Sequence, residues 1–289
     1  MMKNLTAAKK RREWGLSGIE ENIHYGFHPS IICELEKQAF FTQVEPLETT
    51  LEKLLRRDYG ANAKAVETAM AAFSEAITHF VPNNEDMYGS FRIGPSYPLW
   101  SGVMEGLPAS IPEQGKMPSK PHAMFGNFIY FGTYTPDSDG KNSLPGVRIF
   151  DEIRSIEVME RLFNDGIGIL ENVASPDEAI WKLLNLAKFM RNTARTALNV
   201  KKHYIAKQKL SIAGSKALAE KCIAEIEKIV LRERENVLDT IPLVQTDSRL
   251  GWEPSMEYTT DENGLLWKLR QLDYELNFKI PTYRKANAL

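Results

Sequence analysis

The distribution of proline and glycine is the feature that most constrains how this chain can fold. Nine of the 15 prolines and nine of the 18 glycines lie between Pro82 and Phe150. Proline lacks a backbone donor and glycine lacks a side chain that could hold an element together, so this stretch is predicted to be mostly loop. The flanking sequence contains few of either residue and is predicted to be helical.

Apolar residues recur at helical spacing on both sides of this loop region. Before it, a short helix follows Pro29 and Ser30, Pro46 opens a second helix that Gly60 ends, and a third covers residues 62–80. After it, helices are predicted at residues 153–170, 176–210, 216–239 and 261–278. The predicted fold class is mainly α: an antiparallel long-helix bundle with an extended Pro/Gly-rich loop region and at most a short strand near the N-terminus.

Two boundaries of these helices carry explicit signals. Ser175 is predicted to be the N-cap of the 176–210 helix, because Pro176 suits the first helical position and Asp177 and Glu178 suit the first turn. Pro242 is predicted to terminate or bend the helix that contains it.

Charge and cysteine content exclude several classes of protein. Lys and Arg number 36 against 38 Asp and Glu, a net charge of −2, which argues against a dedicated nucleic-acid or anionic-membrane partner. Cys33 and Cys222 are too few for a disulfide framework or a Cys-based zinc cluster. No apolar run reaches the ~20 residues that cross a bilayer, and none follows Met1 as in a signal peptide. The prediction is a cytoplasmic protein without a membrane partner.

His24 and His28 are spaced by four residues, which on a helix could bind a metal ion. Gly26 lies between them and Pro29 follows, so a regular helix is not expected there. No nearby acid or cysteine completes a ligand set. We therefore predict no metal or other cofactor, and a polar pocket wall or a packed loop instead.

Two loops combine polar and aromatic residues. In residues 83–98, aromatic rings could stack on the C–H faces of a sugar while amide and guanidinium groups bond to its hydroxyls. The alternative is a well-packed connector whose Asn and Asp cap turns. Residues 247–258 are similar in composition, and the alternative there is a structural Asp–Arg pair with a Trp lid over the bundle.

Two successive predicted helices carry opposite charge. The basic one holds Lys182, Lys188, Arg191, Arg195, Lys201, Lys202, Lys207 and Lys209. The acidic one holds Glu220, Glu225, Glu227, Glu233 and Glu235. A mutual surface pairing of the two helices is predicted in preference to a nucleic-acid-binding stripe.

Several of these strings resemble one group of proteins. Residues 24–30, His-Tyr-Gly-Phe-His-Pro-Ser, resemble the last barrel segment of large bacterial glycoside hydrolase-like proteins. Those proteins carry a barrel similar to family 20 β-N-acetylhexosaminidases, followed by a helical C-terminal region. Residues 84–98, which include Arg-Ile-Gly-Pro-Ser-Tyr-Pro, and residues 247–256, Asp-Ser-Arg-Leu-Gly-Trp-Glu-Pro-Ser-Met, resemble signature stretches of that region. Residues 57–60, Arg-Asp-Tyr-Gly, fit a helix-ending pattern common after such barrels, and the resemblance covers residues 14–283.

The resemblance implies a division of the chain and a function. Residues 1–45 would be the remnant of the end of a catalytic barrel, and residues 46–289 a helical domain with the long loop region at 82–150. The catalytic acids of such barrels lie at the ends of middle strands, which would precede Met1. Glycoside hydrolysis normally needs two placed carboxylates, or one acid together with a substrate acetamido group, and no convincing pair is found in this chain. The catalytic residues are therefore unknown.

The predicted function is a helical C-terminal region that packs on a catalytic barrel and contributes loops to a sugar site, without being catalytically complete alone. The partners implied are a carbohydrate and a barrel domain or subunit encoded upstream. Candidate substrate-binding residues near the barrel mouth are Trp14, His24, Tyr25 and His28. Candidates in the loops are Asp86, Tyr88, Arg92, Tyr97, Arg249, Trp252 and Glu253.

Two other classes of function stay open at this point. The first is a noncatalytic helical module that binds carbohydrate or a protein partner through the Pro/Gly-rich loops. The second is a nucleic-acid binder that uses the basic helix, which the net charge of −2 disfavours.

Overall fold

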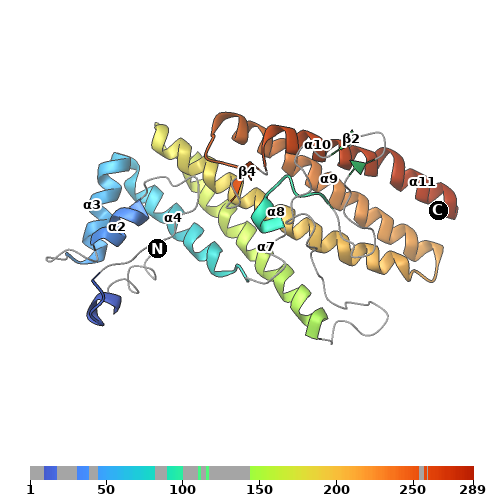
Figure 1. Cartoon of the computed structure of the whole chain (residues 1–289), viewed down its shortest axis with the longest axis horizontal. Coiled ribbons are helices and arrows are strands. Elements are labelled where there is room, and N and C mark those ends of the chain that lie inside the picture. The colour runs from blue at the N-terminus through green and yellow to red at the C-terminus, as the bar shows by residue number, and fades with distance from the viewer. Residues whose placement is uncertain are drawn as a thin grey trace.

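Long antiparallel helices form the body of the molecule (Figure 1). The computed structural model describes residues 10–17, 31–38, 45–81, 90–99, 110–111, 115–116, 144–253, 257–258 and 260–289. Helices α7 (Leu144–Glu171), α8 (Glu178–Ser211) and α9 (Lys216–Thr246) follow one another in antiparallel order, and α10 (Glu262–Tyr274) returns along α9. The predicted mainly α bundle is confirmed.

Shorter elements complete the described part of the chain. The N-terminal elements are α2 (Ile31–Gln38), α3 (Leu47–Tyr59), η1 (Gly60–Asn62) and α4 (Ala63–Thr78), and α4 packs along α7. A short helix α5 (Ser90–Ile93) lies against α8. Helix α10 continues through the π-helical turn η2 (Glu275–Lys279) into α11 (Ile280–Asn287).

Strands are confined to two antiparallel pairs in the described residues. β1 (Ser110–Ile111) pairs with β2 (Gly115–Lys116), and β3 (Trp252–Glu253) pairs with β4 (Glu257–Tyr258). These short strands lie in the loop region and after α9, and most of the N-terminal stretch where a strand was allowed for lies outside the described residues.

Two clusters of buried apolar side chains hold the helices together. The larger one lies between α7, α8, α9 and α10 and includes Phe163, Leu198, Val230 and Trp267. The smaller one joins α2, α3 and α4 to the adjoining ends of α7 and α8. Helices α3 and α4 each bury one stripe of their surface, as the periodicity of the sequence predicts, whereas α8 is buried on several sides between residues 196 and 206.

Some predicted boundaries were wrong. Helix α7 begins at Leu144 instead of residue 153, so the end of the predicted loop region is helical, and α5 adds a helical turn inside it. The N-cap of α8 is Asp177, whose side chain accepts a hydrogen bond from the Ile180 amide at 2.9 Å. Ser175 instead has a positive φ of 59° and lies in the preceding turn. A carboxylate caps as well as a hydroxyl and also favours the positive end of the helix dipole.

Pro242 does not end the helix that contains it, since α9 continues to Thr246. Its side chain is exposed, while Val237, Thr240 and Leu243 extend the buried face on both sides of it. Packing of that face compensates for the hydrogen bond that a proline removes. Gly60 does end α3 as predicted, and it has a φ of 50°.

The basic residues of α8 pair mainly with α7. Lys188 binds Glu171 at 2.6 Å, Arg195 binds Glu160 at 2.7 Å, and Lys202 binds Glu157 at 2.6 Å. The predicted pairing with the acidic helix α9 is represented by Arg191 and Asp239. Acids of α9 also turn to the other side, where Glu220 and Glu227 bind Arg284 of α11. The reason is geometric: α8 lies between two helices, and α7 presents acids that face it.

Within the described residues, no helix is both long and apolar enough to cross a bilayer. This agrees with the absence of a long apolar run in the sequence.

Two glycines of α7 make a matched pair for testing how α4 packs on it. A Cβ atom at Gly166 would lie 2.3 Å from the Phe73 ring of α4, whereas a Cβ atom at Gly168 would meet nothing within 4 Å. Gly166→Ala should lower the free energy of unfolding by about 1–3 kcal/mol through overpacking. Gly168→Ala should raise it by about 0.5–1 kcal/mol, because alanine is the better helix former. Urea denaturation of both variants checks this, and equal effects would contradict the described contact between α4 and α7.

Glu160 of α7 joins three helices, and its ionisation should make the stability of the protein depend on pH. It accepts from Arg195 of α8 at 2.7 Å and from Arg232 of α9 at 2.5 Å. Burial raises the pKa of Glu160, but hydrogen bonds and charges from the two arginines outweigh it and hold the pKa below 4.5. Because the pKa is lowered in the folded state, the stabilisation is fully present above 4.5 and is lost as the pH falls through the folded value.

Glu160→Gln should therefore destabilise the protein at pH 7, and its difference from the wild type should shrink in acid. Denaturation at pH 7 and at about pH 3 measures both differences. Glu157→Gln is the control, since its pair with Lys202 is more exposed and contributes little. A difference for Glu160→Gln that stays the same at both pH values would refute the assignment.

Candidate ligand pocket

The segment Ser90–Leu99 is buried although most of it is irregular backbone. After the turn of α5, Gly94 adopts a φ of 89° and its amide donates to the Ser90 carbonyl at 2.9 Å. Pro95 then prevents further helix, and the Tyr97 amide donates to the Gly94 carbonyl at 2.9 Å. The sequence thus makes a tight turn that carries Phe91 and Arg92 at its start.

A second turn follows the end of α9. Asp247 accepts from the Arg249 side chain at 2.8 Å and from the Arg249 amide at 3.2 Å. Arg249 also donates to the Lys182 carbonyl of α8 at 3.0 Å. Burial raises the pKa of Asp247, but its hydrogen bonds with Arg249 outweigh this and lower it. The structural Asp–Arg pair considered for this loop is confirmed.

Thr260 connects the two turns, which are about 150 residues apart in the sequence. Its hydroxyl donates to the Ile93 carbonyl at 2.6 Å and accepts from the Ser96 amide at 3.3 Å, while its amide donates to the Gly251 carbonyl at 3.2 Å. A Cβ atom at Gly94 would lie 2.9 Å from this hydroxyl, and one at Gly251 would lie 2.1 Å from the Thr260 carbonyl oxygen. Both positions therefore require glycine for close approach.

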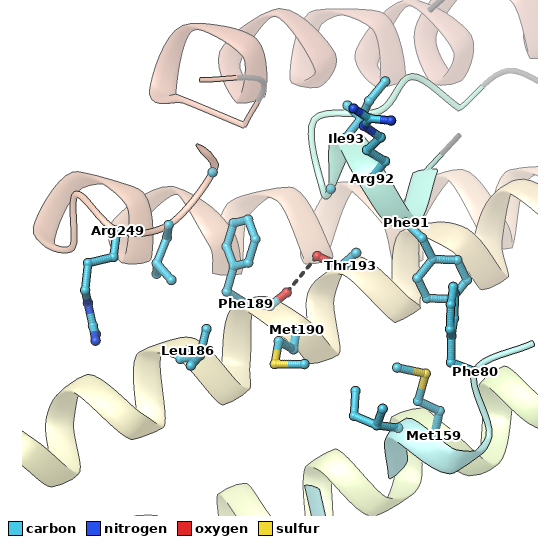
Figure 2. A pocket seen from close by; sticks show the side chains of 14 residues that line it. Phe80, Phe91, Arg92, Ile93, Met159, Leu186, Phe189, Met190, Thr193 and Arg249 are labelled. Carbon is cyan, nitrogen blue, oxygen red and sulfur yellow. Dashed lines mark hydrogen bonds between the residues drawn. The ribbon is translucent and has the colours of Figure 1, made fainter. Parts of the chain in front are cut away.

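The two turns and the helices beneath them enclose a pocket of about 390 Å³ (Figure 2). Its walls come from the end of α4, from α5, from Met159 of α7, from α8 and from the turn after α9. Most of the lining side chains are apolar, and five of them are aromatic or contain sulfur: Phe80, Phe91, Phe189, Met159 and Met190. Figure 2 shows Arg92 and Arg249 on opposite sides of this apolar group.

Polar groups of the pocket are few and partly engaged. The Thr193 hydroxyl donates to the Phe189 carbonyl of the same helix at 3.0 Å. Arg249 is paired with Asp247, which raises the pKa of its guanidinium. Among the described residues that line the pocket, none is an Asp or a Glu. The arrangement suits binding of a ligand with apolar or C–H faces.

The structure places the candidate binding residues predicted from the sequence in different environments. Arg92 and Arg249 come together on one pocket. Tyr97 is 1% exposed and lies in the core, where burial raises the pKa of its hydroxyl. Trp14 is 76% exposed. Neither side chain lines the pocket. The backbone of Trp252 and Glu253 forms β3, and their side chains lie outside the described part. His24, Tyr25, His28, Asp86 and Tyr88 also lie outside the described residues.

The helix residues of the pocket were missed by sequence reasoning. Leu186, Phe189, Met190 and Thr193 occupy one face of α8, and none of them was among the candidate binding residues. The signal was present as a second apolar stripe at spacings of three and four residues beside the core stripe.

No group of three or more His, Cys, Asp or Glu side chains is placed to hold a metal ion within the described part of the chain. The described lining residues of the pocket include no carboxylate, imidazole or thiolate ligand.

Comparisons of the chain with protein-family models, with curated proteins and with solved structures give no match. The resemblance to glycoside hydrolase-like proteins thus stays a prediction based on its sequence strings.

Thr260→Val tests whether this side chain joins the two turns. Valine keeps the shape but leaves the buried Ile93 carbonyl and Ser96 amide without their partner, so the free energy of unfolding should fall by about 1–3 kcal/mol. Thr68→Val is the control, because its hydroxyl bonds only to the Lys64 carbonyl on an exposed helix face. Chemical denaturation of both variants decides, and an equally small effect would mean that Thr260 does not hold the turns.

Proposed function

We propose that this chain is a helical module of a carbohydrate-active, glycoside hydrolase-like protein, and that its pocket binds part of a sugar without hydrolysing it alone. The observation that carries the proposal is that two separate stretches of the sequence meet at one pocket. The two strings that resemble signature stretches of such proteins, around Ile93 and around Arg249, meet through Thr260 at the wall of one pocket.

The chemistry of the walls supports a sugar ligand. Phe80 and Phe91 pack edge to face with ring centroids 4.9 Å apart, and Phe189 lies on the facing helix. Such rings pack against the C–H face of a pyranose or against an acetamido methyl group. Arg92 at the rim can donate to hydroxyl or carbonyl oxygens. A volume of about 390 Å³ lies within the range of small-ligand sites.

The lining residues that the structure describes include no carboxylate. Hydrolysis of a glycosidic bond requires a placed acid together with a second carboxylate or the substrate acetamido group. In this proposal a barrel domain or subunit supplies those groups, and the helical module completes the sugar site.

A second candidate function, docking of a protein partner, is favoured by the rim of the pocket. Ile77 is 44% exposed and Leu186 is 42% exposed, and both line the pocket. Half-exposed apolar side chains beside a hollow are typical of surfaces that another protein covers. The packing of a catalytic barrel on this face would use them.

The sugar proposal is testable because two methionines line the pocket. With methyl-labelled methionine, N,N′-diacetylchitobiose at millimolar concentration should shift the NMR signals of Met159 and Met190. The signal of Met70, which packs in the smaller core cluster, should stay in place. Phe91→Ala should weaken binding about tenfold, since it removes a stacking ring.

Phe278→Ala is the matched control, because this half-exposed ring stacks on Tyr274 and does not line the pocket. It should leave the titration unchanged. A titration in which no pocket methionine responds, or in which Phe278→Ala weakens binding as much as Phe91→Ala, would contradict the proposed function.

A further inference from the structure

A lysine and a glutamate form an ion pair inside the bundle, at the back of the pocket wall. Lys268 of α10 and Glu233 of α9 are both 0% exposed, and the Lys268 ammonium donates to a Glu233 carboxylate oxygen. The same ammonium donates to the Pro95 carbonyl at 2.6 Å. The pair therefore reaches the irregular segment Ser90–Leu99, which supplies Phe91, Arg92, Ile93 and Gly94 to the pocket.

The carboxylate of Glu233 is itself held from a third helix. Thr196 of α8 donates to one of its oxygens at 2.6 Å, and Asn199 donates to the other at 2.6 Å. Asn236 then donates to the Thr196 hydroxyl at 3.0 Å. The direction of the Lys268 ammonium is therefore set by α8 and α9 together, and its bond to the Pro95 carbonyl has little freedom.

A buried ion pair is not explained by stability alone. Desolvation of both charges offsets most of their attraction, so an apolar pair of similar volume is often as stable. What the apolar pair cannot do is hold a backbone carbonyl. The placement of the Lys268 ammonium on the Pro95 carbonyl is the contact that distinguishes this pair from a core replacement.

Two further side chains of the same region hold the segment in the same way. Gln271 of α10 accepts from the Leu99 amide at 3.1 Å and donates to the Leu99 carbonyl at 3.4 Å. Thr260 holds the Ile93 carbonyl and the Ser96 amide. These contacts involve the backbone of the segment.

We propose that the buried Lys268–Glu233 pair is a positioning element, which holds Ser90–Leu99 against α10 and thereby fixes the pocket wall for its ligand. The part that concerns the ligand rests on the proposed function. The part that concerns the segment stands on the contacts alone. Removal of the pair should loosen this segment selectively and weaken ligand binding, in addition to any change in overall stability.

The test compares two buried ion pairs. The double variant Lys268→Met with Glu233→Gln removes both charges, so that no buried charge is left uncompensated and folding is preserved. The control is Lys201→Met, because Lys201 and Glu152 are also buried and form an ion pair that joins α8 to α7. Arg148 still pairs with Glu152 in this control.

Native-state hydrogen exchange gives the first measurement. In the double variant, the amides of Ser96, Tyr97 and Leu99 should exchange about tenfold or more faster relative to amides of α4, which neither variant touches. In Lys201→Met the segment should keep its relative protection. Acceleration spread evenly over the molecule in the double variant would overturn the proposal, since it would mean a merely structural pair.

Binding of N,N′-diacetylchitobiose, followed through Met159 and Met190 well below the melting temperature, gives the second measurement. The affinity of the double variant for the sugar should be lower by about tenfold or more. The affinity of Lys201→Met should lie within about twofold of the wild type. If the wild type binds no sugar, the proposed function fails, and the exchange measurement still decides the positioning role. If sugar binds equally to all three proteins and exchange is unchanged, the positioning role fails and the proposed function stands.

Discussion

The structure depends on one constraint: a backbone segment with little regular structure is buried, so its carbonyl and amide groups need partners inside the protein. Ser90–Leu99 contains only the single turn of α5. Thr260, Lys268 and Gln271 bond to the backbone of Ile93, Pro95, Ser96 and Leu99. Because these side chains project from one stretch of chain, the segment lies in a single position, and the front of that position is the pocket wall.

The need for buried partners extends from this segment to side chains of the helices behind it. An ammonium group that serves a buried carbonyl needs a counter-charge, which Glu233 supplies, and that carboxylate needs donors, which Thr196 and Asn199 supply. The buried polar contacts of Glu233 with α8 and α10 are therefore linked to the burial of the segment. The glycines at 94 and 251 are linked to it as well, because their backbones lie too close to Thr260 for a Cβ atom.

Periodicity predicted the helices well, because a buried stripe repeats every three or four residues whatever the partner is. It did not predict the partners of charged residues. Basic residues of α8 were expected to pair with α9, but most of the observed pairs lead to α7. For the pocket, the composition of two loops led to Arg92 and Arg249, while Phe189 and Met159 were missed because apolar residues on a helix look like core. Tyr97 was a candidate binding residue because it lies in a loop of polar and aromatic residues, but its side chain is buried in the core.

The sequence by itself determined the mainly α class, the separation of helices by a Pro/Gly-rich region, and the local turns that Gly60, Gly94 and Pro95 impose. These are properties of neighbouring residues, since backbone conformation and helical periodicity act over a few positions. Only the tertiary structure decided that the turn at Ile93 meets the turn at Gly251, and that Lys268 lies between Glu233 and Pro95. Such contacts join groups far apart in the chain, and they exist only once the helix faces have packed and the buried polar groups have found their partners.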